Sequence, residues 1–237
     1  MKVKSLLHSL FLVFLLYSCN SAKHRKHLFI LSGQSNMVRM NESKTFITVL
    51  ENEFGKDNII VVKDALGSQS IQRWYKNWKS PRGEVPEQRG DLYDRLMQKV
   101  TNSITNQKIA TVTFIWMQVE RDARMQWSDI YEESLLGLYD QLSEDLKRDD
   151  INFIIGRLND FDMNNEKWPD WTKIRAIQVK VGESNALFSW VNTDDLNDGL
   201  NSEGKIIYND LHMSEKGYDT LGLRFAKNAI RLITENN

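Results

Sequence analysis

The sequence contains little cysteine, proline or histidine, and its charges almost balance. Of 237 residues, one is cysteine, three are proline and four are histidine, and 31 basic against 32 acidic residues leave a formal net charge of −1. A single cysteine excludes a disulfide framework within the chain and a site built from several thiolates. A nearly neutral chain gives no electrostatic reason to expect nucleic acid as a partner. With 41% hydrophobic residues, the chain can instead bury the core of one globular domain.

The N-terminus has the features of an export signal. Lys2 and Lys4 precede an apolar run over residues 6–17, which is typical of a secretory leader and too short for a comfortable transmembrane helix. The segment Leu-Tyr-Ser-Cys that ends at Cys19 resembles the lipobox of bacterial lipoproteins. The resemblance implies cleavage before Cys19 and lipidation of its thiol. A plain signal peptide that is cut nearby is the alternative.

Three segments follow from this interpretation. Residues 1–18 are expected to be a lipoprotein signal peptide, residues 19–26 a polar tether, and residues 27–237 the folded domain. Such a protein is exported and held by lipid on the bacterial cell envelope, either periplasmic or at the cell surface.

Short apolar runs alternate with amphipathic stretches along the rest of the chain. Strands are expected near residues 28–31, 59–62, 110–116, 151–155 and 186–191, and helices near 42–53, 91–102, 127–146, 170–181 and after Ser214. Strands that alternate with helices favour a parallel sheet with helices on both faces. The sequence therefore predicts one α/β domain.

The first predicted strand ends in Ser-Gly-Gln-Ser-Asn, residues 32–36. In open α/β sheets, ligands bind at the carboxyl ends of the strands, and a serine in a tight turn at that edge is a candidate nucleophile. Ser35 is therefore the candidate here. The alternative is a serine that only caps an ordinary helix.

The histidines decide which base can serve Ser35, because a serine hydroxyl is a weak nucleophile until a base takes its proton. The leader removes His8, and His24 and His27 lie at the start of the first strand, at the opposite end of the sheet. His212 is then the base that remains for this edge.

Donors for a developing oxyanion are also expected at strand ends. The candidates are the backbone N–H of Ser35, a backbone N–H at Gly67 or Ser68, and the side-chain amide of Gln118. Ser35 follows the first predicted strand, residues 67 and 68 follow the second, and Gln118 follows the third.

Four blocks occur in order and together carry a family resemblance: Gly-Gln-Ser-Asn-Met (33–37), Gly-Ser-Gln-Ser-Ile-x-x-Trp (67–74), Trp-Met-Gln-Val-Glu (116–120) and Asn-Asp-Leu-His (209–212). The chain resembles SGNH/GDSL-type hydrolases, and within them the sialate O-acetylesterase and acetylxylan esterase group, carbohydrate esterase family 6. The resemblance implies a three-layer α/β/α sandwich with a flavodoxin-like, five-stranded parallel sheet.

The resemblance also implies roles and a reaction. Ser35 is implied as nucleophile, His212 as base, and Gly67 or Ser68 and Gln118 as oxyanion donors. The implied reaction removes O-acetyl groups from a carbohydrate, a sialate or xylan-type glycan, through an acetyl-enzyme and without a cofactor. The alternative is a degenerate surface lipoprotein that binds acetylated glycans without turnover.

Two residues depart from the group. Asn209 occupies the position, three residues before the histidine, where the group usually has aspartate. Three outcomes remain open: Asp210 orients His212 through a shifted loop, Glu120 assists, or the enzyme is slow. Val119 stands where the group usually has glycine, and a β-branched side chain there restricts the backbone.

Substrate contacts are expected at the same edge. The predicted substrate-binding residues are Gln34, Asn36, Arg73, Trp74 and Glu120. Aromatic faces suit sugar stacking, and Arg73, Arg121 or Arg175 can reach a carboxylate or hydroxyl groups, although any one tryptophan is more often part of a core. The acidic residues lack a recognisable ligand spacing, so no metal is expected.

Overall fold

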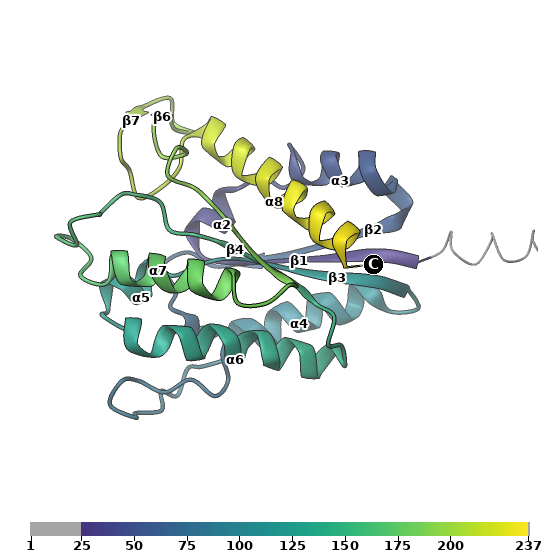
Figure 1. The fold of residues 1–237 in the computed structure, drawn as a ribbon, viewed down its shortest axis with the longest axis horizontal. Helices are drawn as coiled ribbons and strands as arrows, with labels where there is room; N and C mark the ends of the chain where they lie inside the picture. Colours follow the sequence, from purple (N-terminus) through teal and green to yellow (C-terminus); the bar gives the residue numbers. More distant parts are fainter. Residues whose placement is uncertain (1–24, 237) are drawn as a thin grey trace, which may run out of the picture.

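A five-stranded parallel sheet forms the centre of the molecule, in a computed structural model that describes residues 25–236 (Figure 1). The strand order is β2-β1-β3-β4-β5, and every neighbouring pair is parallel. The strands are β1 (Arg25–Gly33), β2 (Ile59–Ala65), β3 (Lys108–Met117), β4 (Asn152–Gly156) and β5 (Phe188–Val191). The predicted α/β fold with five parallel strands is confirmed, and this order is the flavodoxin-like one.

Helices cover both faces of the sheet. Figure 1 shows α3 and α8 on one face and α4, α6 and α7 on the other. The helices are α2 (Ser35–Arg39), α3 (Phe46–Phe54), α4 (Asp91–Ile104), α5 (Glu120–Arg124), α6 (Ser128–Leu146), α7 (Trp171–Gly182) and α8 (Glu215–Glu235), with 3-10 turns η2 (Lys56–Asn58) and η3 (Ile71–Arg73). A two-stranded hairpin, β6 (Gly199–Leu200) and β7 (Ile206–Ile207), precedes α8. The hairpin, α2 and α5 lie near the carboxyl edge of the sheet (Figure 1).

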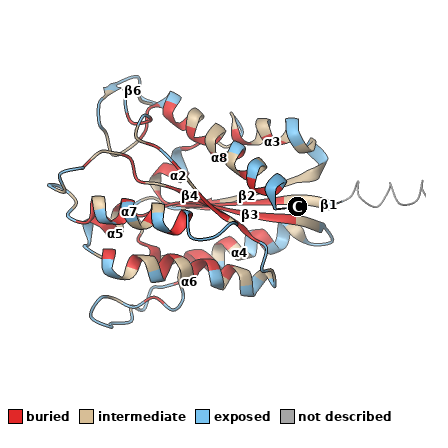
Figure 2. Cartoon of the chain, in the orientation of Figure 1, coloured by how far each residue is buried: buried red, intermediate tan, exposed pale blue. Residues whose placement is uncertain are grey.

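The side chains of β1 show how the sheet separates two cores. Leu28 and Ile30 belong to the hydrophobic cluster under α4, α6 and α7, whereas Phe29 and Leu31 belong to the cluster under α3 and α8. Successive side chains of a strand point to opposite faces, so a run that is apolar throughout requires helices on both sides. Figure 2 shows the result, with buried strands and helices that are exposed only on their outer faces.

Some boundaries differ from the prediction. Strand β1 begins at Arg25, which pairs with Lys108 of β3, so the last two residues of the predicted tether belong to the sheet. Helix α3 begins at Phe46 rather than at residue 42. The reason lies in Lys63 Nζ, which donates to Met40 O at 2.5 Å and Glu42 Oε2 at 2.8 Å and holds this segment in a turn.

The predicted leader and the predicted lipidation site at Cys19 lie outside the described residues. Within residues 25–236, no helix is both long and apolar enough to cross a membrane.

Candidate active site

Ser35 lies where β1 turns into α2 at the carboxyl edge of the sheet. The turn depends on Gly33, which has φ 142°, and a Cβ on that residue would lie 2.0 Å from the carbonyl oxygen of Met117. Only glycine allows β1 and β3 to approach this closely. The next backbone N–H, of Gln34, donates to the same Met117 oxygen at 2.9 Å. The two strand ends are thereby joined, and Ser35 begins the helix with its hydroxyl partly exposed.

His212 reaches Ser35 from the other end of the chain. Its Nε2 lies 3.1 Å from Ser35 Oγ, although 177 residues separate them. Asn159, which follows β4, donates from Nδ2 to the carbonyl oxygen of Asp210 at 3.0 Å. Helix α8 contributes Tyr218, whose hydroxyl accepts a hydrogen bond from the N–H of Met213 at 3.3 Å. The segment after β4 and helix α8 therefore both hold the loop that carries His212 (the histidine loop) against the turn that carries Ser35 (the serine turn).

No close carboxylate orients the outer nitrogen of His212 among the described residues. Asp210 Oδ1 lies 3.9 Å from Nδ1, beyond hydrogen-bond distance, and instead accepts the backbone N–H of His212 at 2.8 Å. Asn209 has φ 43°, and its backbone N–H donates to Asp198 Oδ1 at 2.6 Å. The Glu120 carboxylate accepts hydrogen bonds from Asn36 and Val119 instead, and Asp210 is the acid whose charge acts on the imidazole ring.

The surroundings of His212 favour its neutral form, which is the form that accepts a proton. Burial lowers the pKa of His212, the Arg39 guanidinium lowers it further, and the Asp210 carboxylate opposes both. In contrast to a buried Ser–His–Asp triad, the acidic partner of this base is partly exposed and lies 3.9 Å from the ring nitrogen.

The predicted oxyanion donors are only partly brought together. Gly67 lies beside Ser35, since a Cβ on Gly67 would be 3.8 Å from Ser35 Cβ. Ser68 is exposed, with φ 61°. In the described part of the chain, the backbone N–H groups of Ser35 and Gly67 donate to no other protein group, and the first N–H groups of a helix lack partners within it. These two donors are free for an oxyanion.

Gln118 does not take the predicted position. Its amide Nε2 donates to Asp122 Oδ2 at 2.5 Å and to the carbonyl oxygen of Gln69 at 2.9 Å. Both amide protons are therefore engaged. The correction has a simple cause: Asp122 is completely buried and requires donors. Sequence position at a strand end could not show which neighbour would claim the amide.

A buried polar network lies under the serine turn. Tyr218 O–H donates to Asn36 Oδ1 at 2.8 Å, and Asn36 Nδ2 donates to Glu120 Oε1 at 2.6 Å. Glu120 Oε2 accepts the N–H of Val119 at 3.1 Å. Burial raises the pKa of Glu120 to about 7, and burial raises that of Asp122 to about 7 as well, although hydrogen bonds oppose the shift in both. The network ties the start of α5, the serine turn and α8 together.

None of the five predicted substrate-binding residues is fully exposed. Gln34, Asn36, Trp74 and Glu120 are all buried. Trp74 packs edge-on against Trp116 with ring centroids 5.2 Å apart. The Arg73 guanidinium is held by both oxygens of Asp91 at 2.7 Å. Their role in substrate binding stays a prediction.

Sequence reasoning also missed functional positions. Asn159 holds the histidine loop and Tyr218 bonds to the serine turn, and neither was among the predicted site residues. A signal for the tyrosine existed, because a buried tyrosine hydroxyl needs a polar partner. Nothing in the sequence indicates that Asn159, 53 positions before the histidine, would lie beside it.

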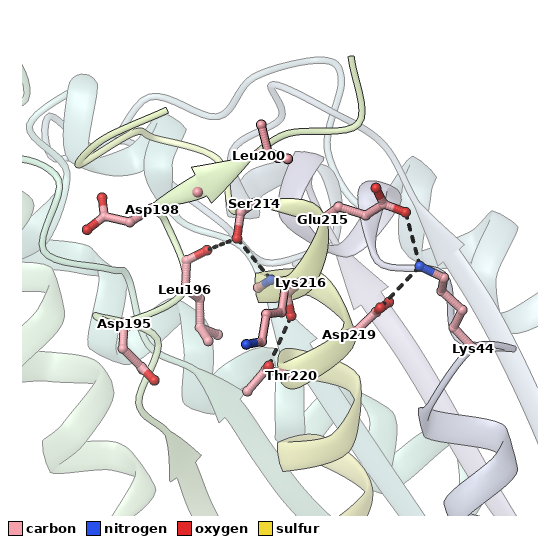
Figure 3. A pocket seen from close by; sticks show the side chains of 12 residues that line it. Lys44, Asp195, Leu196, Asp198, Leu200, Ser214, Glu215, Lys216, Asp219 and Thr220 are labelled. Carbon is pink, nitrogen blue, oxygen red and sulfur yellow. Dashed lines mark hydrogen bonds and ion pairs between the residues drawn. The ribbon is translucent and has the colours of Figure 1, made fainter. Parts of the chain in front are cut away.

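A separate open pocket, of about 660 Å³, lies next to the site between the hairpin and the start of α8 (Figure 3). Neither Ser35 nor His212 lines it. Four carboxylates do, from Asp195, Asp198, Glu215 and Asp219, and Lys44 bridges the last two at 3.1 Å each.

The fold and the serine–histidine contact define a class, the SGNH/GDSL-type hydrolases. Residues 39–231 match the family model described as carbohydrate esterase, sialic acid-specific acetylesterase, and the chain belongs to that family. It is therefore a carboxylic ester hydrolase that acts on carbohydrate O-acetyl groups. Among curated protein sequences, no significant match was found.

Solved structures are similar in fold. A protein of Arabidopsis thaliana is 19% identical, with a TM-score of 0.64 over 87% of this chain and 98% of that one. NanS is 13% identical, with a TM-score of 0.62 over 90% and 99%. A carbohydrate acetylesterase from Xanthomonas citri is 14% identical, with a TM-score of 0.61 over 86% and 56%. At these identities the likeness concerns the fold alone.

Proposed function

We propose that this protein removes O-acetyl groups from sialic acids by a Ser35–His212 mechanism. The 3.1 Å contact between Ser35 Oγ and His212 Nε2 carries the mechanism. The description of the family, as sialic acid-specific, supports the sugar. The contact also argues against the degenerate glycan-binding alternative, because a chain that only binds has no need of a base on its serine.

The reaction proceeds in two halves. His212 Nε2 takes the Ser35 proton while Oγ attacks the acetyl carbonyl carbon, and the N–H groups of Ser35 and Gly67 stabilise the oxyanion. The intermediate collapses, the sugar oxygen leaves with the proton from His212, and Ser35 carries the acetyl group. His212 then deprotonates a water molecule, which attacks the acetyl-serine, and acetate leaves as Ser35 recovers its proton.

Acetate release from O-acetylated sialic acid and from acetylated xylan tests this function. We expect release from the sialic acid, and a loss of about 10⁴-fold or more in kcat for Ser35→Ala and for His212→Ala. Ser43→Ala is the matched control, since Ser43 is an exposed serine in the turn before α3. Equal rates for Ser35→Ala and the wild type would exclude the mechanism. Release of acetate from acetylated xylan and not from the sialic acid would exclude sialic acid as the substrate.

We further propose that the protein is exported and anchored through lipid on Cys19. The basic start, the short apolar run and the serine before Cys19 support this proposal. A single acyl chain binds membranes only weakly, so stable anchoring requires more than one. Wild-type protein should partition into the detergent phase, and Cys19→Ser should remain in the aqueous phase. Equal partitioning of the two would leave a plain signal peptide as the interpretation.

A further inference from the structure

Arg39 is an exposed arginine one helical turn after the candidate nucleophile. It is the last residue of α2, which begins at Ser35. Residues four apart on a helix lie on the same face, with their Cβ atoms about 5–6 Å apart. The long arginine side chain therefore begins beside the serine hydroxyl and extends into solvent at the carboxyl edge of the sheet, on the side of the hairpin.

The Arg39 guanidinium has no partner of its own within residues 25–236. No hydrogen bond, ion pair or ring contact engages it, whereas two of the three arginines that the sequence suggested as carboxylate ligands are paired. Arg73 is held by Asp91 at 2.7 Å, and Arg175 by Asp194 at 2.7 Å. A solvated, unpaired guanidinium can still accept a carboxylate in bidentate geometry.

The charge of Arg39 reaches the catalytic groups. Together with burial, the more important cause, it lowers the pKa of His212. It also reaches the turn of the hairpin, where Lys205 is the main cause of the lowered pKa of Glu203 and Arg39 adds to it. Glu203 does not claim the guanidinium, because its carboxylate is paired with Lys205 Nζ at 2.9 Å. Arg39 thus places a positive potential between the hairpin and the Ser35–His212 pair.

The neighbouring pocket carries charges of both signs. Its lining includes four carboxylates, from Asp195, Asp198, Glu215 and Asp219, together with Lys44 and Lys216. Lys44 pairs with Glu215 and Asp219, and Arg224 pairs with Asp195. These paired charges in the pocket of Figure 3 give a carboxylate less attraction than the unpaired guanidinium of Arg39 beside Ser35.

We propose that Arg39 determines substrate specificity by binding the carboxylate of an acidic sugar whose acetyl ester lies on Ser35. The inference rests on the proposed function and assigns a residue to the recognition of the sugar. A carboxylate bound at Arg39 and an acetyl ester placed at Ser35 together fix one orientation of the sugar ring. This arrangement selects acidic sugars over neutral acetylated ones. Bound carboxylate also neutralises the charge that lowers the pKa of His212.

A matched pair of substrates tests the assignment: the methyl glycoside of an O-acetylated sialic acid, and the same compound with its carboxylate converted to a methyl ester. Wild-type enzyme should favour the acid by about 10-fold in kcat/KM, as expected for one charge-assisted pair. In Arg39→Gln the ratio of kcat/KM for the acid to kcat/KM for the methyl ester should fall close to one, mainly through a higher KM for the acid. Arg39→Lys should restore part of the preference, and added salt should reduce it in the wild type.

Two variants serve as controls for the loss of a positive charge. Lys56→Gln changes a residue of η2, which lies before the start of β2 and at the opposite end of the sheet. Arg121→Gln removes the third arginine that the sequence suggested. Neither should change the ratio. An unchanged ratio in Arg39→Gln, or a ratio that falls only in Arg121→Gln, would overturn the proposal.

Failure of this inference differs from failure of the proposed function. If the wild type hydrolyses both compounds equally, the function stands and Arg39 is not the carboxylate ligand. If the wild type hydrolyses neither compound and no aryl acetate, the proposed function itself fails.

Discussion

The protonation state of one imidazole sets the pH range in which this site works. His212 must be neutral to accept the Ser35 proton, and its pKa lies below the ordinary 6.5 because of burial and, secondarily, Arg39. Activity is lost as pH falls through that lowered pKa, so the acidic limb of kcat/KM for an aryl acetate should have its midpoint below pH 6.5.

The role of Asp210 follows from the same measurement. Its charge raises the pKa of His212 from a distance of 3.9 Å, so Asp210→Asn should move the midpoint to lower pH. The loss in kcat should stay near 10-fold, far from the about 10⁴-fold of a buried triad aspartate. A midpoint above pH 7 in the wild type would instead indicate a close ion pair with a carboxylate.

Val119 occupies a backbone conformation that favours glycine. It is fully buried, with φ 149° and ψ −9°, and such conformations cost about 1–3 kcal/mol for a residue with a Cβ. Val119→Ala leaves a cavity and retains the strain, whereas Val119→Gly leaves the cavity and removes the strain. Urea denaturation should therefore rank Val119→Gly as more stable than Val119→Ala, the reverse of the usual order in which glycine is worse by about 0.5–1 kcal/mol.

A matched comparison makes the Val119 result decisive. The same pair of substitutions at Val100, a buried valine within α4, should show the usual order, because glycine weakens a helix relative to alanine. If alanine is the more stable replacement at both positions, the backbone at Val119 carries no strain.

At the scale of elements, the last helix and the loop before it bring the base to the serine. Ser214 Oγ accepts the N–H of Gly217 at 3.0 Å and caps α8. It also donates to the carbonyl oxygen of Leu196 at 3.3 Å, on the segment that leads into the hairpin. The same hydroxyl thus caps the helix and joins it to the pocket wall in Figure 3.

Removal of this cap should weaken the whole domain. Ser214→Ala should lower the free energy of unfolding by about 1 kcal/mol, the ordinary value for an N-cap. Thr220→Ala in the same helix removes a hydroxyl that only donates back to Lys216 O at 3.0 Å, and should change stability by less than about 0.5 kcal/mol. Equal losses in the two variants would show that the cap contributes nothing specific.

At the scale of the whole molecule, two buried carboxyl groups couple the site to stability. The pKa of Glu120 and that of Asp122 are each raised to about 7, mainly by burial, from ordinary values of 4.5 and 3.8. The folded state thus holds protons that the unfolded state has released. The contribution of these groups is fully present below about pH 4 and is lost as pH rises toward and through 7.

The contribution of these two groups to the free energy of unfolding should therefore fall, by a few kcal/mol, between about pH 4 and pH 7, and should change little above that range. Glu120→Gln should flatten this slope, because its replacement does not titrate. His27 and His212 act in the opposite direction, since their lowered pKa values make stability rise through pH 6.5. The comparison of variant with wild type removes their effect, and identical slopes would contradict the raised pKa of Glu120.

The sequence by itself indicated the architecture and the candidate pair of Ser35 and His212. Apolar runs such as Leu28 to Leu31 require cover on both faces, and this requirement specifies a parallel sheet between helices. Ser35 at a strand end and a single histidine suited to the same edge identified the pair that lies in contact. These features are local, because periodicity and turn chemistry are properties of neighbouring residues.

Tertiary structure decided which polar side chains remain free. Gln118 and Arg73 have the right chemistry for oxyanion and substrate, yet Asp122 engages one and Asp91 the other. Arg39 drew no attention in the sequence and remains unpaired beside the serine in the described part of the chain. The physical reason is that a buried polar group forms hydrogen bonds or ion pairs with whichever groups the fold places beside it. That partner is distant in the sequence, and only the packed chain reveals it.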